Sequence, residues 1–169
     1  MRILVTGADG FLGRGLAAAL AAGRIPVERL VLTDRLPGSA VPDGAEAIAG
    51  DLADPAFLET LLEPGFDLVF HLASVPGSLA EREQDLGYHT NLLAPLALAH
   101  GVVVRRPGAR FVFASSIAVY GALDAATVTL RTPTSPLLTY GAHKLMTEVL
   151  LSDMTRRGAL SAISLRFPG

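Results

Sequence analysis

Tyr140 and Lys144 have the residue types and the spacing that suggest chemistry. They lie four positions apart in a segment with a helical pattern, so both side chains should share one face of the helix. A free tyrosine has a pKa of about 10, and a nearby ammonium group favours the phenolate, which could take a proton from a substrate hydroxyl. Lys144 is the single lysine beside 13 arginines, and a guanidinium would replace a compact ammonium poorly. The alternative is an ordinary surface pair, because this spacing often arises by chance.

Ser115 and Ser116 end an apolar run that is predicted to be a strand, and one of these hydroxyls could orient a substrate oxygen. A serine, a tyrosine and a lysine in one site could form the proton-transfer machinery of a dehydrogenase, in which a hydride leaves the substrate for a nicotinamide ring. Lys144 could also bind the nicotinamide ribose. Together these residues predict an NAD-dependent oxidoreductase.

Three glycines follow the first apolar run at the spacing G-x-x-G-x-x-G, namely Gly7, Gly10 and Gly13. Gly7 would allow the tight turn, Gly10 the approach of a pyrophosphate, and Gly13 the close packing of helix and strand. Amide groups near Phe11 and Leu12 would then face the phosphates at a helix N-terminus. The glycine triplet by itself is equally compatible with an ordinary turn between a strand and a helix.

Acidic residues after the next two predicted strands bear on the choice of cofactor. Asp34 comes about 20 residues after the glycine turn, where a carboxylate can bind the ribose hydroxyls of an adenosine. This carboxylate would repel a 2′-phosphate and so favours NAD, whereas the adjacent Arg35 could pair with that phosphate and keeps NADP open. Asp51 and Leu52 could contact the adenine, or Asp51 could simply close a turn.

The elements that must position these residues alternate along the chain. Continuous apolar runs are typical of parallel strands that are covered on both faces. Their alternation with helical patterns predicts right-handed βαβ units and an α/β fold with a doubly wound parallel sheet. The predicted strands cover residues 2–6, 29–34, 46–50, 67–73, 110–115 and 160–167. The predicted helices cover residues 11–22, 54–62, 79–104 and 136–157, with Asp54-Pro55 as a helix start.

The length of 169 residues predicts one domain, with one long loop at residues 122–136 that could border a site. The last predicted strand ends at residue 167, where an open α/β sheet normally places a ligand-binding loop. We therefore expect these residues to be the N-terminal part of a longer protein.

The composition excludes several classes of protein. A chain that is 50% hydrophobic and 18% charged is not typical of disorder, and a net charge of −2 gives no basis for binding nucleic acid or a membrane surface. No run of about 20 apolar residues predicts a membrane span. Without cysteine there is no disulfide framework, and without a Cys/His cluster we expect no metal site. These features predict a cytoplasmic protein with a small-molecule substrate.

The motifs resemble those of the extended short-chain dehydrogenase/reductase family, also called the NAD-dependent epimerase/dehydratase family. They follow the family order: T-G-x-x-G-F-L-G at 6–13, Asp34, Asp51-Leu52, His71-Leu72-Ala73, Asn91, S-S-x-x-V-Y-G at 115–121, Y-x-x-x-K at 140–144 and R-x-P-G at 166–169. The resemblance implies an NAD(P)-binding Rossmann domain over residues 1–169, continuing into a small substrate-binding domain. It also implies a homodimer that pairs through two long helices.

Further site residues follow from the resemblance. It selects Ser116 over Ser115 as the catalytic serine, because Ser116 lies four residues before the tyrosine of V-Y-G. Asn91 would lie in a helix near the active site and, together with Tyr140 and Lys144, would help to bind the cofactor. The cofactor's ribose and pyrophosphate would lie over the segment after the fourth strand, formed by Leu72, Ala73 and Ser74.

A narrower resemblance, centred on residues 70–91, is to the D-erythronate dehydrogenase branch of the family, which oxidises a sugar-acid hydroxyl and releases NADH. Pro95 is a departure, since the family usually has Asn-x-x-Gly-Thr where this chain has Asn91-Leu-Leu-Ala-Pro, and it could bend the helix. Two alternatives stay open. One is a nucleotide-sugar epimerase or dehydratase that recycles NAD in its active site, and the other is a catalytically inactive NAD-binding sensor.

Three histidines and one tyrosine near these motifs are expected to take no part in the chemistry. We expect His71 to pack at the end of a strand and Tyr120 to pack in the interior. We expect His89 and His143 to lie on helix surfaces.

Overall fold

The computed structural model describes residues 1–23, 25–36, 38, 41–122, 127–129 and 131–168. Its strands form one parallel six-stranded sheet in the order β3-β2-β1-β4-β5-β6. The chain starts in the middle of the sheet, builds outward on one side and then crosses over to build the other. The strands are β1 (Arg2–Thr6), β2 (Arg29–Asp34), β3 (Ala45–Ala49), β4 (Leu68–His71), β5 (Arg110–Ser116) and β6 (Ser161–Phe167).

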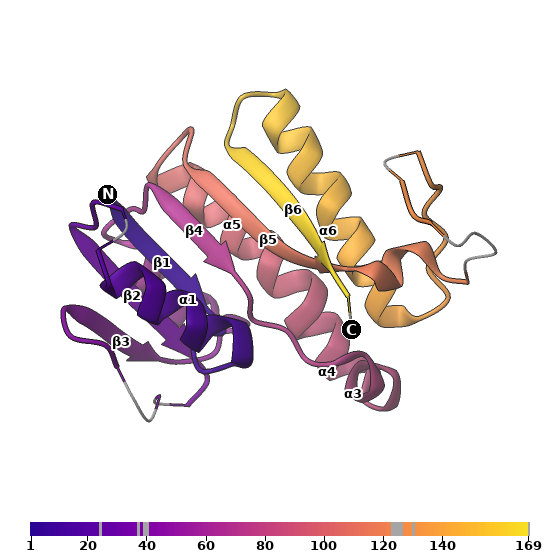
Figure 1. Ribbon diagram of the computed structural model, residues 1–169, viewed down its shortest axis with the longest axis horizontal. Coiled ribbons are helices and arrows are strands. Elements are labelled where there is room, and N and C mark those ends of the chain that lie inside the picture. The colour runs from indigo at the N-terminus through magenta and orange to yellow at the C-terminus, as the bar shows by residue number, and fades with distance from the viewer. Residues whose placement is uncertain (24, 37, 39–40, 123–126, 130, 169) are drawn as a thin grey trace.

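Helices cover both faces of this sheet. The main ones are α1 (Phe11–Ala21), α2 (Pro55–Leu62), α5 (Ala94–Arg105) and α6 (Thr139–Arg156). α1 packs on one face and the other three pack on the opposite face (Figure 1). Alternate residues of β1 serve the two faces, since Ile3 and Val5 are buried with side chains of α1 and Leu4 with those of α2, α5 and α6. Burial on both faces explains the continuous apolar strands and confirms the doubly wound α/β fold.

One predicted helix is built differently. In place of a single helix over residues 79–104, the chain forms α3 (Gly77–Arg82), α4 (Gln84–Tyr88), a π-helical turn η1 (His89–Leu93) and then α5. Glu83 interrupts the first junction, because its backbone angles (φ −119°, ψ 76°) are not helical. The π-helical turn ends just before Pro95, which has no amide hydrogen to donate to the Asn91 carbonyl. A wider helical turn thus stands where Pro95 was expected to bend the helix.

Two side chains start other elements by capping. Asp54 starts α2, as the Asp-Pro pair predicts, by accepting a hydrogen bond of 2.9 Å from the Ala56 amide. Ser116 starts a 3₁₀ turn, η2 (Ile117–Tyr120), by accepting one of 3.1 Å from the Ala118 amide. Of the loop expected at 122–136, residues 123–126 and 130 lie outside the described residues. None of the described helices is long and apolar enough to cross a membrane.

Candidate active site

A cavity of about 390 Å³ opens at the carboxyl edge of the sheet, where β1, β2 and β4 end. β1 and β4 are neighbours in the sheet, and the order of the strands reverses between them, so this is the switch point at which open α/β sheets bind ligands. The cavity brings together eight of the residues predicted to bind a cofactor: Gly7, Gly10, Asp34, Asp51, Leu52, Leu72, Ala73 and Ser74.

The three glycines form a turn that larger residues could not form. Gly7 has a positive φ of 66°, and a Cβ atom on it would lie 2.5 Å from the Ala73 amide nitrogen. A Cβ atom on Gly13 would lie 2.2 Å from the Gly7 carbonyl oxygen. Gly10, in contrast, has a single neighbouring atom within 4 Å of its Cβ position, the Gly7 oxygen at 3.3 Å. The turn is therefore closed toward the protein and open at Gly10, where a phosphate group would have to approach.

The N-terminus of α1 is available to an anion. No side chain caps its first turn, and that turn contains no acidic residue. Phe11 is 95% exposed, so it contributes to this region through its backbone rather than by packing. Uncapped amide groups together with the positive end of the helix dipole suit a pyrophosphate.

Asp34 is held in position at the mouth of the cavity. Its carboxylate accepts hydrogen bonds from the amides of Asp9, at 3.0 Å, and Arg35, at 2.8 Å. The Arg35 side chain turns toward Asp51 instead of Asp34, with Nε 3.6 Å from the Asp51 carboxylate. Asp51 also closes a turn through the Ala53 amide at 2.9 Å, so the two interpretations of this residue are compatible. The Asp34 carboxylate lines the cavity and would repel a 2′-phosphate, so the arrangement favours NAD over NADP.

Asn91 lies beside the cavity without lining it. The side chain is buried in η1 and bonds both to the Val75 amide, at 2.9 Å, and to the Val75 carbonyl, at 3.0 Å. The Ser74 hydroxyl donates to the same Asn91 oxygen at 2.9 Å. Asn91 therefore holds the segment after β4, which itself lines the cavity.

Lys144 connects the start of α6 to the end of β5. Its Nζ atom donates a hydrogen bond of 2.9 Å to the Ala114 carbonyl and lies 5.4 Å from the centre of the Tyr140 ring. The Lys144 side chain is 2% exposed, which does not fit the alternative of an ordinary surface pair. Tyr140 is half-buried one helical turn earlier, so an ammonium group and a phenol share this end of the sheet.

Burial changes the acid–base properties of this region. It lowers the pKa of Lys144 to about 8, because the charged form loses its hydration. Burial, assisted by the charge of Lys144, lowers the pKa of His71 to about 3. His71 bonds to the Thr6 hydroxyl at 2.7 Å and stacks on Phe113, with 5.9 Å between the ring centres. Its predicted role as a packing residue at a strand end is confirmed, whereas Thr6 was not anticipated.

The two serines have different surroundings. Ser115 is buried and its hydroxyl donates to Glu148. Ser116 is less buried, and its oxygen accepts from the Ala118 amide, which leaves the hydroxyl hydrogen able to donate to a ligand. The surroundings thus favour Ser116 as the residue that could meet a substrate.

Glu81 in α3 was missed by the sequence analysis. Its carboxylate accepts from the Tyr140 amide at 3.3 Å and from the Thr139 hydroxyl at 3.4 Å, and so holds the first turn of α6. An acidic residue suits that position because the helix N-terminus is electropositive. Nothing in the sequence between Glu81 and Tyr140 signals that they meet.

The prediction for His143 was wrong. This residue is 5% exposed and burial lowers the pKa of its imidazole, while the charge of Glu81 opposes that shift. The face of α6 that carries it is covered by the preceding helices, including Tyr88, whose ring centre lies 6.0 Å away. His89 is exposed, as expected. Among the described residues, no group of three or more His, Asp or Glu side chains could hold a metal ion.

Comparison with known proteins gives a family match over nearly the whole chain. The sequence profile of the NAD dependent epimerase/dehydratase family matches residues 3–168. A D-erythronate dehydrogenase from Cupriavidus necator is 36% identical over 99% of this chain and 55% of its own length. The chain thus spans about half the length of the curated relatives that it matches.

Solved structures are similar in fold as well as in sequence. A nucleoside-diphosphate-sugar epimerase from Agrobacterium tumefaciens has a TM-score of 0.92 and 35% identity, over 99% of this chain and 52% of that chain. The UDP-glucose 4-epimerase of Thermus thermophilus, solved as a complex with NAD, has a TM-score of 0.86 and 28% identity, over 98% of this chain and 54% of that chain. The relatives named here therefore include one dehydrogenase and two epimerases.

Proposed function

Because this chain belongs to the NAD dependent epimerase/dehydratase family, we propose that it carries the cofactor-binding and proton-transfer residues of an NAD-dependent oxidoreductase. The observation that carries this proposal is the cavity at the carboxyl edge of the sheet, with the open glycine turn at one side and Asp34 at another. The amides at the start of α1 would hold the pyrophosphate, and the Asp34 carboxylate would accept hydrogen bonds from the adenosine ribose. Leu72, Ala73 and Ser74 would lie beneath the cofactor.

Residues at the end of β5 and at the start of α6 share the proton transfer. NAD, when bound, supplies the hydride acceptor. Tyr140, as a phenolate, takes the proton of the substrate hydroxyl, and Lys144 stabilises that phenolate and binds the nicotinamide ribose. Ser116 donates a hydrogen bond to the substrate oxygen. Burial of Lys144 beside Phe113 strengthens its electrostatic effect, because little water is present to screen it.

We favour a dehydrogenase that oxidises a hydroxyl of a sugar acid. The support is the D-erythronate dehydrogenase relative, which is the most similar in sequence of the relatives named above. The epimerase or dehydratase is the second candidate, because the two solved structures named above are epimerases. The two reactions share the first hydride transfer and differ in whether NADH leaves the enzyme.

The release of NADH separates these candidates. The full-length protein as encoded would be mixed with NAD and a panel of aldonic acids that includes D-erythronate, and NADH absorbance followed over time. A steady increase in NADH absorbance supports the dehydrogenase. If no acid of the panel raises the NADH absorbance, and UDP-glucose and UDP-galactose are interconverted without NADH release, the epimerase is favoured instead.

We also propose a homodimer in which α5 and α6 of two copies pair. Large apolar side chains are exposed on and next to these helices, at Leu93, Val104, Met146 and Val149. Exposed apolar groups that gather on neighbouring helices are typical of a protein interface. A cytoplasmic location is proposed as well, since a chain without cysteine needs no oxidising compartment.

A further inference from the structure

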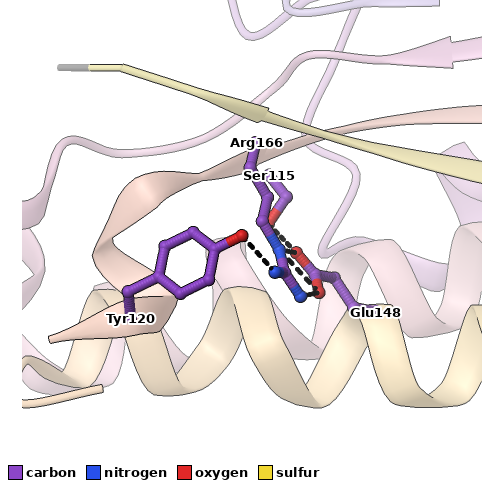
Figure 2. Close-up of polar contacts among 4 residues, drawn as sticks. All are labelled: Ser115, Tyr120, Glu148 and Arg166. Carbon is purple, nitrogen blue, oxygen red and sulfur yellow. Dashed lines mark hydrogen bonds and ion pairs between the residues drawn. The ribbon is translucent and has the colours of Figure 1, made fainter. Parts of the chain in front are cut away.

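Four polar side chains, those of Ser115, Tyr120, Glu148 and Arg166, form a connected network (Figure 2). The Glu148 carboxylate accepts hydrogen bonds from the Ser115 hydroxyl and from Arg166, whose Nε and Nη2 atoms lie 3.0 Å and 2.6 Å from the two carboxylate oxygens. The Nη1 atom of Arg166 donates to the Tyr120 hydroxyl at 2.7 Å. Every charged oxygen of Glu148 therefore has a partner.

The network joins the elements that carry the reactive groups. Ser115 in β5 lies directly opposite Arg166 in β6, in the register of the parallel pair. Glu148 lies on α6 one turn after Lys144 and two turns after Tyr140, and therefore on the same face of that helix. Figure 2 shows Arg166 reaching from β6 toward Glu148 on α6, with the Tyr120 ring beside it.

The residues on both sides of Ser116 in the chain are held by this network. Ser115, which the network holds, is the residue before Ser116, and η2, which ends at Tyr120 of the network, directly follows it. On the other side, Lys144 donates to the carbonyl of Ala114, the residue before Ser115. Three consecutive residues of β5 thus contact, in order, the lysine, the network and the 3₁₀ turn.

The exposure of the Glu148–Arg166 ion pair indicates whether it serves stability or orientation. The Glu148 side chain is 10% exposed and that of Arg166 is 30% exposed. Charged groups lose hydration when they are buried, so a buried ion pair contributes little net stability to the fold. Its two parallel hydrogen bonds do fix the orientation of the two side chains. The Glu148 carboxylate raises the pKa of Arg166 above its ordinary value, so the guanidinium stays charged over the physiological range of pH.

We propose that Glu148 and Arg166 are positioning residues that hold the end of β5 against α6, so that Ser116, Tyr140 and Lys144 keep one geometry. The pair touches neither substrate nor cofactor in this role and acts through Ser115, Tyr120 and the helix. The catalytic consequence rests on the proposed function, whereas the effect on the geometry does not.

The first test uses the single lysine of the chain as a reporter. In the full-length protein labelled with ¹³C at lysine Cε, the Lys144 resonance is assigned by its loss in Lys144→Met, and it reports on the end of β5, to which the Nζ atom is bonded. In Glu148→Gln the resonance is expected to shift or split, because β5 loses one of its two polar contacts with α6 and only the bond from Lys144 to Ala114 stays. The control is Glu46→Gln, which removes a more exposed Arg–Glu pair, Arg29–Glu46 at 2.8 Å, between β2 and β3 at the opposite edge of the sheet. The control should leave the resonance unchanged.

The second test measures turnover of the full-length protein. Glu148→Gln is expected to lower kcat by about 10- to 100-fold, with KM for NAD changed by less than about twofold, since small misplacements of reacting groups cost rate rather than binding. Glu46→Gln should keep wild-type kcat. If wild-type protein shows no turnover, the proposed function fails, and the Lys144 resonance still decides the positioning role.

Milder variants guard against loss of folding. Ser115→Ala removes the hydrogen bond from the Ser115 hydroxyl to Glu148, and Tyr120→Phe removes the hydrogen bond from Arg166 to the Tyr120 hydroxyl. Both are expected to move the Lys144 resonance in the same direction as Glu148→Gln, by less. Lower thermal stability with a wild-type Lys144 resonance in all three variants would overturn the proposal.

Discussion

Lys144 links the composition of the chain to its chemistry. It is the single lysine of the sequence, it is almost fully buried, and its ammonium group reaches the backbone at the end of β5. An ammonium in a poorly hydrated site attracts a neighbouring phenolate strongly, and this accounts for a lysine at this position in an arginine-rich protein. The same burial makes its own proton easier to lose.

The titration of Lys144 can be predicted from that burial. The pKa in the folded chain is about 8, below the ordinary 10.5, so between these values the unfolded chain binds more protons than the folded chain. This group's contribution to stability should therefore rise with pH from about 8 to 10.5 and be flat below that window. A ¹³C NMR titration of the labelled lysine checks the pKa, and Lys144→Met should remove the corresponding slope. A midpoint at 10.5 would refute the assignment.

Asp34 should control the choice between NAD and NADP. Asp34→Ala removes a charged acceptor for the ribose hydroxyls, and a hydrogen bond to a charged group typically contributes about 1.5–3 kcal/mol, so NAD affinity should fall by roughly tenfold or more. NADP affinity should fall less or rise, because the repulsion of its 2′-phosphate disappears. Calorimetric titration with both cofactors measures the ratio. Equal losses for the two would mean that Asp34 only holds the Asp9 and Arg35 amides.

The first turn of α1 has no space for a side chain at Gly13. Gly13→Ala would place a Cβ atom 2.2 Å from a backbone oxygen that cannot move aside without opening the turn. We expect a loss of about 1–3 kcal/mol in the free energy of unfolding, as for other overpacked sites, together with weaker NAD binding. Gly15→Ala is the control in the same helix, since no atom lies within 4 Å of that Cβ position. It should stabilise the chain by up to about 1 kcal/mol, because alanine is the better helix former.

The sequence was sufficient to predict the elements whose signals are local. Apolar runs, the glycine spacing and the Tyr140–Lys144 spacing depend on neighbours along the chain, and the strands and α6 were found from them. The break at Glu83 and the burial of His143 were not found, because they depend on which helices cover α6. The Glu148–Arg166 network also joins residues far apart in sequence, and such pairing leaves no periodic signal.

The proposed dimer depends on exposed apolar side chains of α5 and α6. Val149 is 64% exposed, and Val149→Asp would bury a charge if this face were covered by a second copy. Size-exclusion chromatography with light scattering should then show a dimer for the wild type and a monomer for the variant. Ala19→Asp, on an exposed position of α1 on the opposite face of the sheet, is the control and should stay dimeric. A wild-type monomer at micromolar concentration would contradict the dimer.

In the proposed reaction Tyr140, on a helix held against the end of β5, takes the substrate proton, while other residues bind most of NAD. Tyr140→Phe removes one oxygen atom, and steady-state turnover and NAD affinity of the full-length variant measure the two parts of that claim independently. We expect turnover to fall by about 10²- to 10⁴-fold, the range typical of a general base, with NAD affinity within about twofold of wild type. Turnover that survived the substitution would contradict this proposal.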